Sequence, residues 1–146
     1  MEIPYILTRP GAKAPVYATP GAAAADLCAA LDAPLTLAPG QRALIPTGVA
    51  VQLPGPQWVA LLCARSGLAV KRGLTLSNGV GVIDSDYRGE IQAGVVNLGE
   101  GPVTIEPGER VAQLMLMPVA QGTFVQAQSL DGTARGEGGF GSTGRQ

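Results

Sequence analysis

Short apolar runs separated by turn signals recur along the whole chain. The clearest run covers 58–63, where Trp, Val, Ala, Leu, Leu and Cys follow a Pro-Gly-Pro turn signal. Similar runs cover 16–17, 35–37, 43–46, 49–53, 73–76, 91–97, 102–105, 111–117 and 122–128. Many short strands at near-regular spacing are typical of an all-β jelly roll or β-clip barrel, and we predict that fold class.

One segment departs from this pattern and predicts a short helix. Residues 66–73 begin with Ser66, a residue type favoured at helix starts, and end with Gly73, a type favoured just past helix ends. The 21 glycines and 12 prolines are spread along the chain, which argues against longer helices. A length of 146 residues without a domain linker fits one β domain, which we place at 1–131.

The C-terminal segment 132–146 is rich in glycine and poor in core-forming residues. We expect it to be flexible on its own, and the plainest interpretation is a disordered tail. Its glycines nevertheless expose backbone N–H groups that suit phosphate oxygens, and its Arg, Phe, Ser and Thr add a charge, a stacking surface and hydroxyl donors. It has neither the lysine nor the following helix of a Walker-type phosphate loop.

Composition then narrows the function classes. The formal net charge of −1 leaves no basic surplus for binding a nucleic-acid backbone. No apolar run is long enough to span a bilayer, and the N-terminus lacks the features of a signal peptide. We therefore expect a cytoplasmic protein with no membrane or nucleic-acid partner. The low charged fraction of 14% favours an oligomer that hides part of its surface.

The absence of histidine limits the chemistry further. It excludes Ser-His and Cys-His nucleophilic systems, so any general base is expected to be a carboxylate and any metal to be held by oxygen. Cys28 and Cys63 are far apart in sequence and have no companion metal ligands, so we interpret them as reduced thiols.

The stretch 76–90 concentrates the candidate chemistry. Its Asn78-Gly79 pair is a strong signal for a tight hairpin turn. Asp84 and Asp86 are two residues apart, so on a strand their side chains share one face. We expect a hairpin that brings two carboxylates and the ring of Tyr87 into one small space.

Five separate segments together resemble the motifs of the trimeric dUTP pyrophosphatase (dUTPase) family, in the family's order: 24–27, 64–69, 81–90, 108–114 and 135–144. The resemblance spans nearly the whole chain. It implies a jelly-roll homotrimer with active sites at the subunit boundaries. It also implies Mg²⁺-assisted hydrolysis of dUTP to dUMP and pyrophosphate, which lowers dUTP and supplies dUMP for thymidylate synthesis.

The resemblance also implies roles for single residues. Asp84 would be the general base that activates the attacking water, and Asp26 would face Mg²⁺ through water. Tyr87 would pack against the sugar and exclude a 2′-hydroxyl. The expected phosphate ligands are Arg65, Ser66, Gly67 and Gln113.

Uracil selection is expected from backbone groups around Val82 and Ile83, the amide of Asn78 and, on the returning strand, Gln92. Asn78 has a competing interpretation as a turn residue alone. The tail would act as a lid, with Phe140 stacked over uracil and the outer phosphates held by Arg135, Ser142 and Thr143; Gly141 is also expected to bind the substrate. Asp86 is expected to be structural and to pair with either Arg88 or Arg110, between which the sequence does not choose.

Two other functions fit parts of the pattern. The first is a dCTP deaminase, or a bifunctional dCTP deaminase and dUTPase, on the same fold. The second is a non-catalytic nucleotide-binding or signalling module. The Phe-Gly-Ser-Thr tail and the Asp-Ser-Asp-Tyr run favour the dUTPase interpretation over both.

Overall fold

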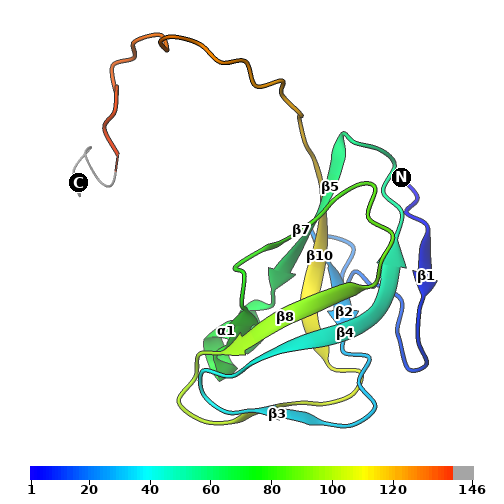
Figure 1. Cartoon of the computed structure of the whole chain (residues 1–146). Coiled ribbons are helices and arrows are strands. Elements are labelled where there is room, and N and C mark those ends of the chain that lie inside the picture. The colour runs from blue at the N-terminus through cyan, green and yellow to red at the C-terminus, as the bar shows by residue number, and fades with distance from the viewer. Residues whose placement is uncertain (140–146) are drawn as a thin grey trace.

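The computed structural model describes residues 1–139, which form short antiparallel strands and one short helix (Figure 1). In chain order the elements are β1 (Tyr5–Leu7), β2 (Ala25–Cys28), β3 (Leu35–Leu37), β4 (Arg42–Val51), β5 (Trp58–Ala64), α1 (Ser66–Arg72), β6 (Leu74–Leu76), β7 (Gly81–Ile83), β8 (Ile91–Asn97), β9 (Val103–Ile105) and β10 (Arg110–Pro118).

Two four-stranded sheets make up the body of the molecule, with strand orders β1-β4-β8-β6 and β2-β10-β5-β7. A two-stranded sheet of β3 and β9 covers one end (Figure 1). The predicted all-β jelly-roll class is confirmed, although the sheets of residues 1–139 do not close into a barrel. Aliphatic side chains fill the space between the sheets, and each such burial stabilises the fold by about 1.5–3 kcal/mol; the largest are Leu27, Ile45, Ile91 and Ile105.

The alternation of side chains along each strand decides which residues are left for function. On β8, Ile91, Ala93 and Val95 point into the core, while Gln92 is exposed. On β2, Leu27 is buried and Asp26 is turned toward the outer face.

The predicted helix is confirmed and ends as expected. Gly73 has φ 71° and closes α1 with N–H bonds to the carbonyls of Ala69 and Leu68. A Cβ at Gly73 would lie 2.3 Å from the backbone N of Gly99, so only glycine fits. The expected serine cap is wrong, because Arg65 is the N-cap and makes no side-chain cap bond. Among residues 1–139 no helix is long and apolar enough to cross a membrane.

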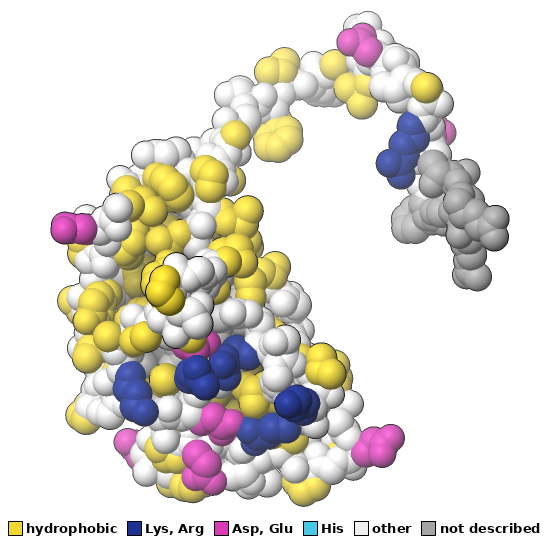
Figure 2. Space-filling model, turned by 180° about the vertical axis from the view of Figure 1, so that it is seen from behind, with side chains coloured by type: hydrophobic (Ala, Val, Ile, Leu, Met, Phe, Trp, Pro, Cys, Tyr) yellow, Lys and Arg dark blue, Asp and Glu magenta, His cyan; other side chains and the backbone are white. Residues whose placement is uncertain are grey.

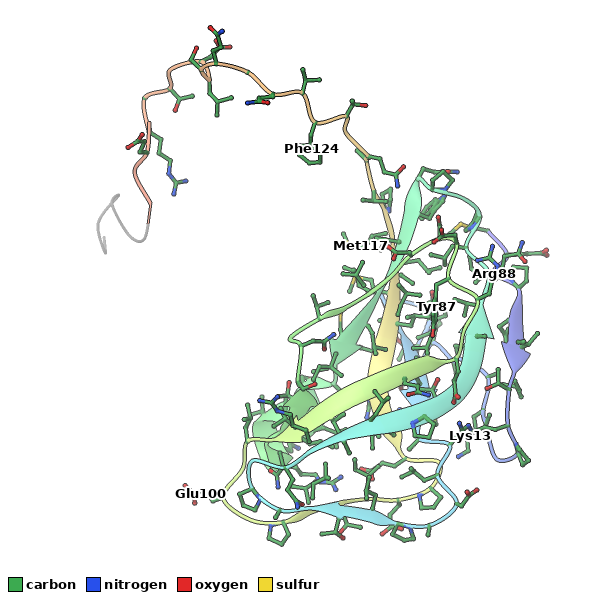
Figure 3. The ribbon with its side chains drawn as sticks, viewed as in Figure 1. Lys13, Tyr87, Arg88, Glu100, Met117 and Phe124 are labelled. Carbon is green, nitrogen blue, oxygen red and sulfur yellow. The ribbon has the colours of Figure 1, made fainter. Side chains whose placement is uncertain are left out.

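The strand predicted at 122–128 is wrong for this chain. Residues 119–139 leave the sheets after β10 and form an extended arm without a strand (Figure 1). The side chain of Phe124 is fully exposed (Figure 3), and Val125 and Leu130 are nearly so. An apolar period-2 pattern forms a strand only where a neighbouring strand accepts its hydrogen bonds, and the arm has none here. The division into a domain of 1–131 and a lid of 132–146 stays a prediction.

Candidate active site

The stretch 76–90 does not form the two-stranded hairpin that we predicted. Gly79 does make the expected tight turn, with φ 75°. However, β6 before the turn pairs with β8 in one sheet, whereas β7 after it pairs with β5 in the other. The Asn-Gly turn therefore carries the chain from one sheet to the other.

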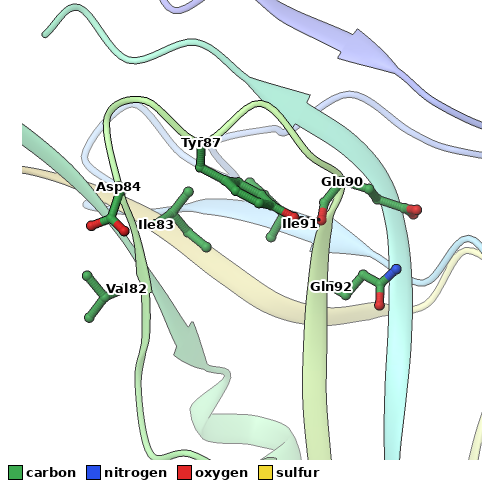
Figure 4. Close-up of a pocket in the computed structure, with 7 residues that line it drawn as sticks. All are labelled: Val82, Ile83, Asp84, Tyr87, Glu90, Ile91 and Gln92. Atoms are coloured by element: carbon green, nitrogen blue, oxygen red, sulfur yellow. Dashed lines mark hydrogen bonds between the residues drawn. The ribbon is translucent and has the colours of Figure 1, made fainter.

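The next connection, residues 84–90, returns the chain from β7 to β8 and so crosses between the sheets again. Because β7 and β8 belong to different sheets, they diverge and leave a pocket of about 390 Å³ between them (Figure 4). Its walls are Val82, Ile83, Asp84, Tyr87, Glu90, Ile91 and Gln92. The structure thus brings five predicted site residues to one pocket. It places the exposed Asn78 outside the lining, with its amide nitrogen near Gly81.

Asp84 follows the last residue of β7, at the edge of this pocket (Figure 4). It also lines a second cavity of about 580 Å³, together with Trp58 and Asp86. Within the described chain its carboxylate makes no hydrogen bond or ion pair. An exposed carboxylate that is not held by a donor can hydrogen-bond to a water molecule, as a general base must.

Glu90 is the other carboxylate of the pocket, and sequence reasoning missed it. One of its oxygens accepts the N–H of Gly48 at 2.7 Å, and the other pairs with Arg9 at 2.9 Å. Partial burial alone would raise the pKa of the Glu90 carboxyl. The hydrogen bonds and charge of Arg9, Gly48 and Gln92 outweigh that effect and hold the pKa below its ordinary value. Glu90 is therefore an ionised anchor for the loop, and Asp84 is left as the unpaired carboxylate of the pocket.

Tyr87 folds back over the loop that carries it. Its hydroxyl donates to the carbonyl of Glu90 at 3.0 Å, and its N–H closes a turn with the carbonyl of Asp84 at 3.2 Å. Tyr87 as a whole is 45% exposed, and its ring lies along the pocket rim (Figures 3 and 4).

The ion pair expected for Asp86 is not formed with either candidate arginine. Arg88 donates instead to the carbonyls of Ser85 and Tyr87, at 2.7 and 2.9 Å. Arg110 pairs with Asp26 at 3.0 Å. Within one chain, the guanidinium group of Arg88 therefore binds backbone carbonyls of its own loop, and that of Arg110 binds the less exposed carboxylate of Asp26.

A second group of predicted residues lies on the outer face of the β2-β10-β5-β7 sheet. Gln113 on β10 is paired in register with Asp26 on β2 and with Cys63 on β5. Arg65 follows directly after β5 and donates to Asp26 at 2.8 Å, so two arginines hold the two oxygens of one carboxylate. The amide nitrogen of Gln113 donates to the carbonyl of Ala64 at 2.8 Å.

The start of α1 lies beside this group, and ion pairs connect both ends of the helix to the same sheet. Ser66 and Gly67 are exposed in the first turn. Arg65 binds Asp26 at one end, and Arg72 pairs with Glu109, next to β10, at the other. Figure 2 shows cationic and acidic side chains interleaved on the lower part of the rear face, below a region of apolar side chains.

The pocket and the Asp26–Arg65 group lie at opposite ends of the β5–β7 ladder. Ile83 pairs with Ala60 near the start of β5, whereas Arg65 lies just past the end of that strand. At about 3.3 Å per strand residue, Asp84 and Arg65 are roughly 20 Å apart along the ladder. One chain therefore carries two half-sites that do not meet.

The tail residues cannot all be placed. Phe140, Gly141, Ser142 and Thr143 lie outside the described residues. Arg135 is on the arm, which runs away from both sheets (Figure 1), and its side chain donates to the carbonyl of Gly138 at 2.8 Å.

Few side chains of the described residues could coordinate a metal ion together. Residues 1–139 contain no cluster of three or more Cys, Asp or Glu side chains that could enclose a metal ion. Asp26 is the one acidic side chain in the second half-site group, and its side chain is 12% exposed. A single carboxylate fits Mg²⁺ only where substrate oxygens and waters complete the coordination.

Comparisons with known proteins agree with this geometry. Residues 11–144 match the family model described as dUTPase. The deoxyuridine 5'-triphosphate nucleotidohydrolase of Desulfitobacterium hafniense (strain DSM 10664 / DCB-2) is 54% identical, over 99% of this chain and 95% of its own length. The protein of the same name from Thiobacillus denitrificans is 49% identical over the full length of both chains.

Solved structures show the same fold. The dUTPase of Staphylococcus bacteriophage 80alpha with dUpNHpp has a TM-score of 0.90 and 29% identity, and each chain is covered to 98%. A mutant dUTPase from phage phi11 of S. aureus, described with a structural Mg(II) ion, has a TM-score of 0.81 and 23% identity, covering 90% of this chain and 100% of the phage chain. The match over nearly the whole sequence, at about half identity to the bacterial proteins, shows that this chain belongs to the dUTPase family.

Proposed function

We propose that the protein hydrolyses dUTP to dUMP and pyrophosphate, as a cytoplasmic homotrimer that uses Mg²⁺. The reaction would lower dUTP and supply dUMP for thymidylate synthesis. The observation that carries the proposal is the pocket between β7 and β8, with the unpaired Asp84 carboxylate at its edge.

The edge of β7 suits recognition of uracil. This strand pairs with β5 on one side only, so its other backbone edge has no partner among residues 1–139 and faces the pocket. The edge of uracil offers an acceptor, a donor and an acceptor, which backbone N–H and C=O groups at Val82 and Ile83 match. Cytosine has a donor in place of one acceptor, and a mismatched buried group is strongly rejected. Gln92 and the Asn78 amide would complete the contacts.

Asp84 would act as the general base. A water held by its carboxylate attacks the α-phosphorus, the carboxylate takes the water's proton, and the bond to the β-phosphate oxygen breaks so that pyrophosphate leaves. Tyr87, on the same loop, would lie against the sugar and leave no room for a 2′-hydroxyl.

The second half-site would hold the phosphates. Arg65, Ser66, the Gly67 N–H and Gln113 supply a charge, a hydroxyl and amide donors. Phosphate oxygens would compete with Asp26 for the Arg65 guanidinium, while Arg110 keeps its own bond to Asp26. An oxygen of Asp26 would then face the waters of bound Mg²⁺, which supplies charge neutralisation of the triphosphate.

A single nucleotide can use both half-sites only if they come from different copies of the chain, because on one chain they are about 20 Å apart. Two further features support association. The chain has an apolar cavity of about 480 Å³, with walls that include Ile3, Tyr5, Tyr17 and Leu116. It also exposes the apolar strand β1. A ring of three copies would give three shared sites, and the arm would bring Arg135, Phe140, Gly141, Ser142 and Thr143 over a site as a lid.

One assay tests this function against the alternatives. The protein is incubated with Mg²⁺ and with dUTP, dCTP or UTP in turn, and pyrophosphate and ammonia are followed. We expect pyrophosphate from dUTP alone. Ammonia from dCTP would show a deaminase, and the absence of both products would show a binding module.

Mixing two inactive variants tests the shared site. Asp84→Asn damages the pocket and Arg65→Gln damages the phosphate half-site, so each variant alone should be nearly inactive. In randomly assembled trimers of both, about a quarter of the sites receive an intact half from each variant, and that share of activity should return.

The matched control mixes Asp84→Asn with Tyr87→Ala. Both changes lie in the same half-site, so every site keeps one defect, and the mixture should be no more active than the mean of its two separate components. If the first mixture is no more active than its separate components, each site is built from one chain and the proposed trimer arrangement is wrong.

A further inference from the structure

The position of the Tyr87 ring depends on the absence of a side chain at Gly89. A Cβ built on Gly89 would lie 2.4 Å from the Tyr87 hydroxyl oxygen and 2.6 Å from the ring carbon that bears it. Both separations are far below van der Waals contact. The ring therefore rests directly on the backbone of residue 89, where any other residue would displace it.

Backbone conformation does not account for this glycine. Gly89 is not among the glycines with positive φ, so a side chain would cause no backbone strain. Gly79 in the preceding turn is the opposite case, with φ 75° and open space where its Cβ would stand. What Gly89 provides is room for the ring.

The surroundings leave the ring as the part that would move. Glu90 fixes the end of the loop through Gly48 and Arg9, and Arg88 ties the loop to the carbonyls of Ser85 and Tyr87. Tyr87 is an exposed residue, and its ring is held at the tip by one hydrogen bond, to the carbonyl of Glu90 (Figure 4). A methyl group at residue 89 would break that bond and push the ring away from the loop backbone.

We propose that Gly89 is a positioning residue for sugar selectivity. Its missing side chain lets the Tyr87 ring lie flat on the loop, at the depth where the ring admits a 2′-hydrogen and rejects a 2′-hydroxyl. This inference rests on the proposed function, in which Tyr87 contacts the sugar. Gly89 touches no substrate and acts through the ring.

The test compares kcat/KM for dUTP and for UTP in Gly89→Ala. One methylene group more or less in an apolar pocket changes discrimination by about 10–200-fold, and a displaced ring changes the space by at least as much, so the ratio of dUTP to UTP should fall at least about 10-fold. The control is Gly101→Ala, because Gly101 has open space around its Cβ position and no positive φ. Its ratio should equal that of the unmodified protein.

A double-variant cycle separates this role from a general structural one. Tyr87→Ala alone should relax the ratio, and adding Gly89→Ala to it should change the ratio no further, because the clash has gone. If Gly89→Ala fails to fold, the double variant should fold as well as Tyr87→Ala, and a double variant that also fails to fold would overturn the inference.

The same measurements separate the role of Gly89 from the proposed sugar contact of Tyr87. If Tyr87→Ala relaxes the ratio while Gly89→Ala keeps it, the role of Gly89 is wrong and the proposed function stands. If the unmodified protein already hydrolyses UTP as well as dUTP, the sugar contact of Tyr87 is wrong and the role of Gly89 falls with it.

Discussion

Asp84→Asn should lower kcat for dUTP by about 10²–10⁴-fold, the range that general-base catalysis contributes. The carboxylate lies at the edge of the β7–β8 pocket and is held by no donor in residues 1–139, so it can hydrogen-bond to the attacking water. The amide of asparagine has the same shape but cannot accept that proton. Binding of the nucleotide should change little, because base, sugar and phosphate contacts remain.

The measurement pairs pyrophosphate release at saturating dUTP with the affinity for dUpNHpp. Asp32→Asn is the matched control, since Asp32 is exposed and outside both half-sites, and it should keep normal turnover. A fully active Asp84→Asn variant would rule out Asp84 as the base. Loss of dUpNHpp binding and turnover together would show that Asp84 holds the substrate rather than the water.

Deletion of residues 135–146 should reduce kcat/KM for dUTP by at least about 100-fold, the effect of a small loss of alignment at a reacting centre. The deleted segment holds Arg135 and the proposed lid residues Phe140, Gly141, Ser142 and Thr143. The fold and the oligomeric state should persist, because the arm leaves the sheets after Pro118 and contributes no strand to them.

A shorter deletion gives the control. Removing only residues 145–146 leaves the whole segment that matches the dUTPase family, which ends at residue 144, and should have little effect. Thermal unfolding and sedimentation would confirm that both shortened proteins are assembled. A near-normal rate after deletion of 135–146 would refute the lid.

Most of the fold could be predicted from local patterns. The run at 58–63 became β5, and Gly73 ended α1, because each signal depends on a few neighbouring residues. The strand predicted at 122–128 was wrong because a strand needs a neighbouring strand to pair with, and the local sequence does not show whether one is present. The Asn-Gly turn was predicted correctly, but the hairpin expected around it was not formed. The strands before and after the turn pair with β8 and β5, which are distant in sequence and belong to different sheets.

The same division applies to the site. Asp84, Tyr87 and Gln92 are close in sequence and meet in one pocket, as expected. Arg110 pairs with Asp26 instead of Asp86, because β10 lies next to β2 in the sheet. Glu90 and Gly89 were missed, because their importance comes from Gly48, Arg9 and the Tyr87 ring and leaves no pattern in the sequence.

The pocket lies between β7 and β8, which belong to different sheets. Its width therefore depends on the distance between the two sheets. Packed sheets are held about 10 Å apart by the side chains between them. Leu62 on β5, the strand beside β7, and Ala93 on β8 are among these core side chains, although neither lines the pocket. Under the proposed function, the space for a flat pyrimidine ring is therefore set by the packing of aliphatic side chains in the core, so a change in core volume would alter which bases fit without changing any residue that touches them.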